Sequence, residues 1–375
     1  MRKGERKTVD EKVRIQNADR RVLIFGGAGF IGSNWASRLL KETDASVHIF
    51  DNLSRAGVHH NLEWLKNMAC KTGRLKVTIG DIRNAQLVER ATADATEIYH
   101  FAAQAAVTTS VIDPRHDFEV NALGSFNVLE GARRSGNRPF VLFTSTNKVY
   151  GDMGARGLAM TSTRYRYTDC LGIDENQPLD FHSPYGCSKG SADQYVRDYS
   201  RIYGIPAVVF RMSCIAGEQQ FGNEDQGWVA HFLYSALQEH RLTIFGDGRQ
   251  VRDVLYVGDL MRAFDAARRA LPRVEGEIYN IGGGAENTVS LLELMELIEE
   301  LTGKEVDHIF EQRRPGDQLI YTTDFAKFSR DTGWKPRSDV RSTLAHIYDW
   351  WKSSRDIFEP ELALAAAGIE LPRTA

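Results

Sequence analysis

Short runs of apolar residues alternate with amphipathic segments along most of the chain. The runs RVLIF (21–25), SVHIF (46–50) and FVLFTS (140–145) are nearly continuous, and helix-like segments such as 30–41 separate them. Nearly continuous apolar runs are typical of strands in a parallel sheet that is covered on both faces. The pattern therefore predicts an α/β fold in which a parallel sheet lies between two layers of helices.

The pattern changes twice, and these changes divide the chain. Residues 152–183 are polar and show no clear period, and a segment of this length in a compact domain is usually functional or disordered. Beyond Ser213 the apolar runs are shorter and more mixed, which predicts a smaller C-terminal lobe woven onto the sheet domain. The expected order is a flexible polar leader (1–20), the sheet domain (21–212) with an insertion (152–183), a substrate-binding lobe (213–356) of which part returns to the sheet domain, and a C-terminal tail (357–375).

Composition and charge exclude several kinds of partner. The net charge of −3 over 375 residues gives no reason to expect nucleic acid or a membrane surface as a partner. The chain lacks the run of about 18 apolar residues that a membrane span needs, and the polar leader lacks the apolar core of a signal peptide. The cysteines are scattered without a C-x-x-C pair, so we expect reduced thiols, no metal site and a cytoplasmic protein.

The first apolar run ends in the glycine-rich segment GGAGFIG (26–32). Its glycines satisfy G-x-G-x-x-G, in which glycine permits a tight turn, close approach of the backbone to a pyrophosphate and close helix–strand packing. The second apolar run ends in Asp51, and a carboxylate there accepts hydrogen bonds from the adenosine ribose and repels a 2′-phosphate. These features predict a Rossmann-type, doubly wound sheet that binds NAD rather than NADP. Arg55 argues mildly for NADP, because an arginine can bind the 2′-phosphate.

Tyr185 and Lys189 form a Y-x-x-x-K motif at the start of a predicted helix (186–203). A spacing of four residues puts both side chains on one helical face. A neighbouring ammonium group stabilises a phenolate and lowers the pKa of a tyrosine from about 10 towards neutrality, as a general base requires. The preceding strand end, FTSTNKVYG, places Thr146 where its hydroxyl could bond to a sugar hydroxyl or a developing ketone.

Several motifs together carry a family resemblance. They are the glycine-rich segment, HFAAQ (100–104), TSTNKVYG (144–151), YGCSK (185–189) and VRDVLYVGD (251–259). In these motifs the chain resembles the extended short-chain dehydrogenase/reductases, which include nucleotide-sugar epimerases, dehydratases and decarboxylases. The resemblance implies Thr146, Tyr185 and Lys189 as the catalytic triad, tightly bound NAD and a nucleotide-sugar substrate. It also implies a homo-oligomer, a dimer or tetramer formed through the helices near 117–134 and 186–203.

The same resemblance extends to the residues that hold the two ligands. Arg252 and Arg314 correspond to the arginines that bind the nucleotide diphosphate, and Asp317 corresponds to the acid that closes on the nucleotide ribose. Arginine suits this role because its planar fork of donors matches phosphate oxygens. The cofactor is expected to contact Gly26, Gly29, Phe30, Ile31, Gly32, Asp51, Asn52, Ser54, Arg55, Asp81, Ile82, Ala102, Ala103, Gln104, Thr144, Tyr185 and Lys189. The substrate is expected to contact Gln104, Thr108, Thr146, Asn147, Arg164, His182, Ser183, Arg211, Ser213, Gln226, Val229, Arg252, Arg314 and Asp317.

The residues after Thr146 distinguish the branches of this family. Its dehydratases carry an Asp-Glu pair directly after the triad threonine, because elimination of water needs an acid and a base. Here these positions hold Asn147 and Lys148, and the acidic residue that the decarboxylases usually carry in this stretch is also missing. Hydride removal and return can be served by the tyrosine and NAD alone, so an epimerase is the economical interpretation.

Four further segments resemble the CDP-paratose 2-epimerases, also called CDP-tyvelose 2-epimerases. They are TRYRY (163–167), DFHSPYGCSKG (180–190), FRMSCIAG (210–217) and QFGNEDQGWV (220–229), in the insertion and the substrate-binding regions. The chain departs from the usual pattern at three positions beside the expected pocket, which bears on fine specificity. Ala216, Glu218 and Gln219 stand where the family more often carries Tyr, Pro or Gly, and Arg.

The resemblance thus implies an NAD-dependent epimerase that inverts carbon 2 of a CDP-linked hexose, from CDP-paratose to CDP-tyvelose or from CDP-glucose to CDP-mannose. The expected route is transient oxidation by bound NAD, a 2-keto intermediate and return of the hydride to the opposite face. A UDP-hexose 4-epimerase shares every cofactor and triad residue and stays an alternative. A non-catalytic NAD-sensing protein of the same fold is a second alternative, although such proteins commonly lose the tyrosine or the lysine and this chain keeps both.

Overall fold

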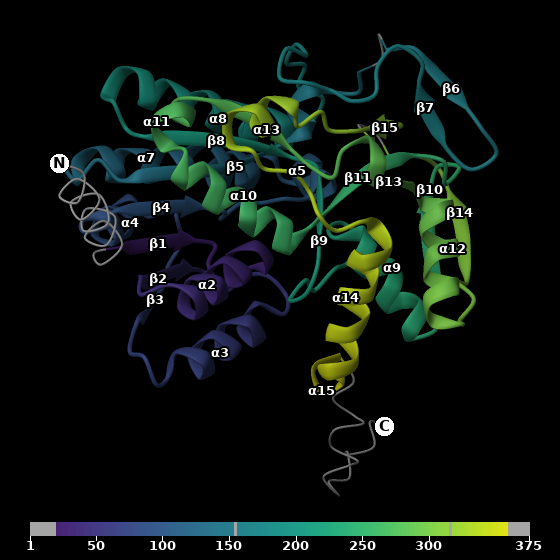
Figure 1. The fold of residues 1–375 in the computed structure, drawn as a ribbon, viewed down its shortest axis with the longest axis horizontal. Coiled ribbons are helices and arrows are strands. Elements are labelled where there is room, and N and C mark those ends of the chain that lie inside the picture. The colour runs from purple at the N-terminus through teal and green to yellow at the C-terminus, as the bar shows by residue number, and fades with distance from the viewer. Residues whose placement is uncertain (1–19, 154–155, 315–316, 359–375) are drawn as a thin grey trace, which may run out of the picture.

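The computed structural model describes residues 20–153, 156–314 and 317–358. Its centre is a seven-stranded sheet with the order β12-β8-β5-β4-β1-β2-β3, in which every pair is parallel (Figure 1). The strand order reverses between β1 and β4, so the sheet is doubly wound, and the Rossmann-type prediction is confirmed. Its strands are β1 (Arg21–Phe25), β2 (Ser46–Asp51), β3 (Leu75–Ile79), β4 (Glu97–His100), β5 (Phe140–Thr146), β8 (Ala207–Met212) and β12 (Ile278–Ile281).

Helices cover both faces of this sheet. In β1, Val22 and Ile24 belong to one apolar core, whereas Leu23 and Phe25 belong to another. Successive side chains of a strand point to opposite faces, so a run that is apolar throughout has both faces buried. One face packs against α2 (Phe30–Glu42), α3 (Val58–Ala69) and α10 (Val257–Arg269), and the other against α4 (Ala85–Thr92), α7 (Gly124–Arg134) and α8 (Pro184–Tyr203).

Arg20, which the sequence placed at the end of the leader, is buried in the sheet domain. Its guanidinium donates two hydrogen bonds to Glu97, at 2.7 and 2.9 Å, and Arg268 of α10 donates to the same carboxylate at 2.7 Å. A buried carboxylate needs such partners because an unpaired charge in the core is strongly destabilising. The cluster ties the chain before β1 to the helix layer. Residues 1–19 lie outside the described residues.

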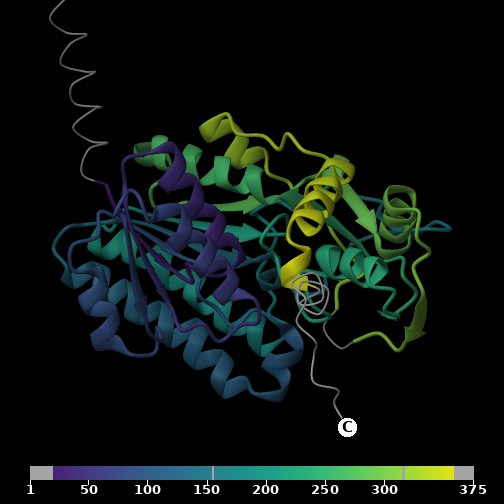
Figure 2. The ribbon, with the colours of Figure 1, turned by 90° about the horizontal axis from the view of Figure 1, so that it is seen from below.

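A smaller lobe lies beside the sheet domain (Figure 2). One of its sheets contains β9 (Cys214–Ala216), β11 (Val251–Tyr256), β13 (Thr288–Ser290) and β15 (Ile320–Tyr321), and the other pairs β10 (Leu242–Phe245) with β14 (His308–Glu311). The helices α9 (Trp228–Leu237), α12 (Leu291–Thr302) and α14 (Val340–Ser353) enclose its own apolar core. Between these elements the chain returns to the sheet domain, where β12 pairs with β8 and α10 covers the sheet.

The polar insertion contains a short hairpin of β6 (Leu158–Met160) and β7 (Tyr165–Tyr167) beside the lobe (Figure 1). Hydrogen bonds hold the hairpin there. The Tyr165 N–H donates to the Arg249 carbonyl at 3.0 Å, and the Tyr165 hydroxyl donates to Asp247 at 2.8 Å. These polar contacts explain why the segment shows no apolar period.

The remaining elements are short. They are α5 (Val107–Ile112), α6 (Pro114–Phe118), a π-helical turn (Glu119–Leu123), two 3₁₀ turns (Asn147–Tyr150 and Ala285–Asn287), α11 (Leu271–Val274), α13 (Ala326–Thr332) and α15 (Arg355–Phe358). Within the part of the chain that the structure describes, no helix is both long and apolar enough to cross a membrane.

Candidate active site

The glycine-rich segment forms the turn between β1 and α2. Gly26 has φ +76°, a conformation that favours glycine, and a Cβ there would lie 2.6 Å from the Ala102 nitrogen. A Cβ on Gly32 would lie 2.2 Å from the Gly26 carbonyl oxygen. Side chains are therefore excluded from the turn, and α2 begins at Phe30 without a side-chain hydrogen bond from its N-cap residue, Gly29. This arrangement fits the pyrophosphate of a dinucleotide.

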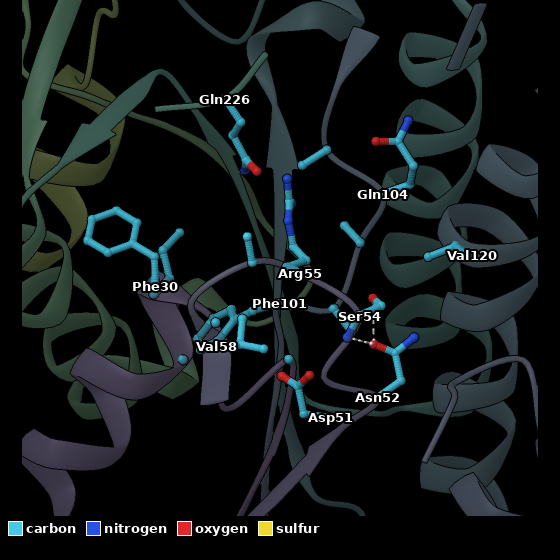
Figure 3. Close-up of a pocket in the computed structure, with 18 of the residues that line it drawn as sticks. Phe30, Asp51, Asn52, Ser54, Arg55, Val58, Phe101, Gln104, Val120 and Gln226 are labelled. Carbon is cyan, nitrogen blue, oxygen red and sulfur yellow. Dashed lines mark hydrogen bonds between the residues drawn. The ribbon is translucent and has the colours of Figure 1, made fainter. Parts of the chain in front are cut away.

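A cavity of about 410 Å³ lies next to this turn, around the carboxyl ends of β1 and β2 (Figure 3). Doubly wound sheets bind their ligands at this edge, beside the reversal of strand order. Thr144, Tyr185 and Lys189 do not line the cavity and lie on β5 and α8. The other residues expected to contact the cofactor all line it, together with Gln226: Gly26, Gly29, Phe30, Ile31, Gly32, Asp51, Asn52, Ser54, Arg55, Asp81, Ile82, Ala102, Ala103 and Gln104.

Asp51 lines the cavity at the end of β2, where backbone donors orient its carboxylate (Figure 3). Oδ1 accepts a hydrogen bond from the Leu53 N–H at 2.9 Å, and Oδ2 accepts one from the Ala28 N–H at 3.0 Å. Burial raises the pKa of this carboxyl, and the backbone donors oppose that rise. The side chain is thus held at the position where the sequence predicts contact with a ribose.

Arg55 enters the cavity from the loop after β2, and in Figure 3 its guanidinium points towards Gln226 and away from Asp51. Asn52 shapes this loop, because its side-chain oxygen accepts hydrogen bonds from the Ser54 N–H and hydroxyl at 3.1 and 2.8 Å. The arginine is an exposed loop residue that brings a cation to the cavity.

Residues 218–221, part of the stretch that the sequence places beside the pocket, bridge the lobe and the helices next to the glycine turn. Asn34 Nδ2 of α2 donates to the Glu218 carbonyl at 2.9 Å, and Asn61 Nδ2 of α3 donates to the Gln219 carbonyl at 3.2 Å. From residue 219 onward the segment lines the cavity. Main-chain carbonyls carry both contacts, so the departures from the family pattern at Glu218 and Gln219 are compatible with this bridge.

Thr146 and Tyr185 meet where β5 ends and α8 begins. Both residues are buried, and the Thr146 side chain favours the phenolate form of Tyr185. Lys189, one turn further along α8, donates from Nζ to the Thr144 carbonyl at 2.6 Å and lies 4.2 Å from the centroid of the Phe143 ring. The structure thus gathers the predicted triad on two adjoining elements.

Burial dominates the pKa values of the two titratable members of this triad. It raises the pKa of Tyr185 to about 12, although the hydrogen bond from Thr146 favours the phenolate, and it lowers the pKa of Lys189 to about 7. The sequence led us to expect that Lys189 lowers the pKa of Tyr185. The structure differs because the ammonium group is directed at the Thr144 carbonyl and desolvation of the phenol outweighs the other effects.

Asp117, which sequence reasoning also missed, is a buried carboxylate beside α8. It accepts hydrogen bonds from Gln104 Nε2 and Asn121 Nδ2, each at 3.0 Å, and from Ser188 Oγ. Burial raises the pKa of Asp117, and its charge opposes the fall in the pKa of Lys189. The network holds Gln104, which lines the cavity, against the helix that carries the catalytic pair.

A charged cluster lies on the lobe side of Thr146. Arg252 Nη2 of β11 lies 3.3 Å from Asp317 Oδ1, and Lys148 Nζ lies 3.8 Å from the same oxygen. Asn147, between Thr146 and Lys148, is buried. The cluster therefore contains two expected substrate residues, Arg252 and Asp317. Its third member, Lys148, was not assigned to the substrate from the sequence.

Arg314 belongs to a second charged cluster. Its guanidinium lies 3.7 Å from the centroid of the Phe245 ring, pairs with Glu224, and lies 3.6 Å from Asp225 Oδ1. The Thr108 hydroxyl donates to the same Asp225 oxygen at 2.7 Å. Because Asp225 lines the cavity, this cluster joins the sheet domain to the lobe at the edge of the cavity.

Several expected substrate residues have structural partners elsewhere. The buried Arg211 donates to both oxygens of Asp193, at 2.7 and 3.0 Å, and to the Tyr150 hydroxyl at 3.0 Å. His182 borders a separate cavity of about 330 Å³, and its Nε2 lies 2.8 Å from Asp180 Oδ2. Ser213 donates to Asp253, and Ser183 caps α8 by accepting from the Gly186 N–H. Val229 is buried in the core of the lobe.

Arg164 anchors the insertion on the lobe and does not line the cavity. Its guanidinium donates to both carboxylate oxygens of Glu293, and to the hydroxyl and carbonyl oxygens of Thr288 at 3.0 and 3.1 Å. Glu293 also closes the capping box of α12 with Ser290.

Arg164→Ala is therefore expected to lower the free energy of unfolding by about 1–3 kcal/mol, because Glu293 loses its charged partner and keeps only the neutral donors Thr163 and Ser290. Thermal melts and limited proteolysis within the insertion measure this effect. Arg166→Ala, at an exposed position of β7, is the matched control and should change neither. Unchanged stability in Arg164→Ala would mean that this anchor contributes nothing measurable.

The family model described as GDP-mannose 4,6 dehydratase matches residues 23–347. The chain belongs to this family. A CDP-paratose 2-epimerase of Salmonella typhi is 40% identical over 341 residues, which cover 89% of this chain and 99% of that protein.

Two solved structures show how broad this family is. A dTDP-glucose 4,6-dehydratase from Streptomyces venezuelae, with NAD and TYD bound, superposes with a TM-score of 0.78 at 29% identity, covering 91% of this chain and 99% of that one. A UDP-glucuronic acid 4-epimerase from Bacillus cereus, in complex with UDP-glucuronic acid and NAD, gives 0.76 at 26%, covering 89% and 99%. The resemblance inferred from the motifs is confirmed.

Proposed function

We propose that the protein is an NAD-dependent epimerase that inverts carbon 2 of a CDP-linked hexose, converting CDP-paratose to CDP-tyvelose or CDP-glucose to CDP-mannose. The observation that carries this proposal is the Tyr185–Thr146 pair beside a turn, Asn147–Tyr150, that contains no carboxylate. Elimination of water needs an acid and a base at this place, whereas epimerisation by hydride transfer needs the tyrosine alone. The 40% identity to a CDP-paratose 2-epimerase supports the choice of nucleotide and carbon.

The cavity beside the glycine turn would hold NAD, with the N-terminus of α2 towards the pyrophosphate and Asp51 towards the adenosine ribose. Thr144, Tyr185 and Lys189 would hold its other end. When bound, NAD supplies an acceptor for the hydride of carbon 2 and, once reduced, a donor for its return.

Tyr185 takes the proton of the carbon 2 hydroxyl as the ketone forms, and gives it back when the hydroxyl is restored. Thr146 favours the phenolate, but burial outweighs this effect and raises the pKa of Tyr185 to about 12. An opposite charge close by favours the charged form of an acid, and an oxidised nicotinamide ring carries a positive charge. The tyrosine therefore becomes an effective base chiefly in the complex with the oxidised cofactor.

The ketone must present its other face before the hydride returns, so the sugar has to turn within the site. Arg252 and Arg314 would hold the diphosphate through charge-assisted hydrogen bonds, which are stronger than bonds to neutral hydroxyls. A firm hold on the diphosphate and a looser hold on the sugar permit this rotation.

A UDP-hexose 4-epimerase remains the alternative, since it shares the same cofactor and triad residues. The two are distinguished by incubating the protein with CDP-paratose and with CDP-, UDP-, GDP- and dTDP-glucose, and by following the sugar products by NMR. Inversion at carbon 2 of the CDP sugars is expected. Inversion at carbon 4 of UDP-glucose would instead support the alternative, and no turnover of any substrate would support an NAD-sensing protein.

Asp51 leads us to expect that the purified protein carries NAD and little NADP. Its carboxylate, fixed by two backbone donors, repels a 2′-phosphate. Mass spectrometry of the nucleotide released on denaturation measures the ratio. A preponderance of NADP would mean that Arg55, inside the same cavity, outweighs the carboxylate.

A further inference from the structure

Lys148 lies immediately beside the catalytic pair. It follows Thr146 in the 3₁₀ turn, and its N–H donates to Thr146 Oγ1 at 3.2 Å. Its carbonyl oxygen packs on the first turn of α8, where a Cβ added to Gly186 would lie 3.1 Å from it. The residue is therefore placed by the same elements that place Tyr185 and Thr146.

The Lys148 side chain shares one carboxylate with a second cation. Its side chain is 19% exposed, and its ammonium and the Arg252 guanidinium face the same oxygen of Asp317, at 3.8 and 3.3 Å. The other Arg252 hydrogen bonds go to the Val251 and Gln318 carbonyls, which are neutral. Among the described residues, this cluster thus holds two cations for one anion.

Such an arrangement is unfavourable unless another anion joins it. Burial lowers the pKa of Lys148 to about 8, and the nearby Arg252 adds to that fall, so the ammonium group is held at a cost. A sugar hydroxyl is neutral and would leave the excess positive charge in place. A diphosphate carries negative charge on several oxygens and can accept from both cations.

We propose that Lys148 and Arg252 together bind the diphosphate of the nucleotide sugar, with Lys148 next to the sugar. This inference rests on the proposed function, because it assigns a further residue to the same site. Binding of the diphosphate replaces Asp317 as the partner of both cations and leaves that carboxylate available to the nucleotide ribose. A lysine at a position where dehydratase relatives carry an acid then serves binding and not elimination.

The test is calorimetric titration of CDP and of CDP-glucose into the NAD-loaded full-length protein and its variants. Lys148→Met is expected to weaken the binding of both ligands about tenfold, the loss expected for one charge-assisted hydrogen bond. Lys148→Arg should retain most of the affinity. Lys66→Met, which removes an exposed ion pair with Glu63, is the matched control and should bind as the wild type does.

Three results would overturn the inference. Wild-type affinity for CDP in Lys148→Met would remove Lys148 from the diphosphate site, and weaker binding of CDP-glucose with unchanged CDP would place it on the sugar. Failure of the wild-type protein to bind any nucleoside diphosphate would instead remove the proposed function as well. If Lys148→Met loses NAD or melts early, Lys148→Gln, which keeps a neutral donor, gives the same comparison.

Discussion

Tyr185→Phe is expected to lower turnover by about 100-fold or more while NAD stays bound, because it removes the group that moves the proton and leaves the buried ring in place. The lost hydroxyl is the one whose ionised form Thr146 favours, and the adjoining turn offers no carboxylate to replace it. Turnover at saturating substrate, followed by NMR, measures the effect, and absorbance of the released nucleotide measures NAD.

A control on the same helix separates this effect from a general disturbance of α8. Tyr195 is 47% exposed and lies outside the cavity, so Tyr195→Phe should keep wild-type turnover. Activity of Tyr185→Phe within a few-fold of the wild type would remove Tyr185 from the mechanism.

Gly32→Ala is expected to leave the purified protein without NAD. A Cβ at this position would lie 2.2 Å from the Gly26 carbonyl oxygen and 2.7 Å from the Gly27 Cα, so the backbone of the turn and α2 must move apart. Overpacking of this kind costs about 1–3 kcal/mol, which corresponds to about 5- to 150-fold in affinity when the displaced groups bind the ligand. NAD bound per chain after gel filtration is the measurement.

Gly29→Ala, in the same turn, provides a graded comparison. Its added Cβ meets a single neighbouring atom, at 3.2 Å, and should reduce NAD retention less than Gly32→Ala does. Full NAD content in Gly32→Ala would contradict the view that close packing of this turn shapes the cofactor site.

The fold was predictable because its signals are local. Nearly continuous apolar runs such as 140–145 mark strands whose two faces are both buried, and β5 is buried along its whole length. The glycine turn has its own local signature, since Gly26 and Gly32 are required by backbone contacts within a few residues or with the adjoining strand end. The cavity could therefore be placed at the correct edge of the sheet from sequence alone.

The parts that could not be predicted depend on partners far apart in the chain. Arg164 and Arg211 are residues of the type that binds phosphate. Their guanidinium groups instead pair with Glu293 and Asp193, respectively, and no sequence pattern indicates these pairs. The same limit applies to Asp117, whose partners come from three segments of the chain.

The catalytic pair shows a related limit. The Y-x-x-x-K spacing correctly indicates that Tyr185 and Lys189 share a helix, but it does not indicate how strongly each group is desolvated. Burial moves the two pKa values to about 12 and about 7, and the Thr144 carbonyl, from a neighbouring strand, takes the Lys189 hydrogen bond. In the proposed mechanism the oxidised cofactor supplies the remaining activation of the tyrosine, which the spacing alone could not reveal.

Two chemistries could invert carbon 2. One oxidises the carbon 2 hydroxyl, with Tyr185 accepting its proton, and returns the same hydride to the other face. The other removes the proton of carbon 2 as the nucleotide leaves, and adds the nucleotide back. The second route needs a base at carbon 2 and exchanges the hydrogen of that carbon with solvent.

In the proposed mechanism a hydride leaves carbon 2 and returns to it. The most direct measurement follows CDP-paratose deuterated at carbon 2 by NMR and mass spectrometry during turnover, with a parallel reaction of unlabelled substrate in heavy water. If the same hydride returns, the product keeps the substrate deuterium and takes up none from heavy water. Solvent hydrogen at carbon 2 of the product would contradict the hydride route and leave elimination and re-addition as the mechanism.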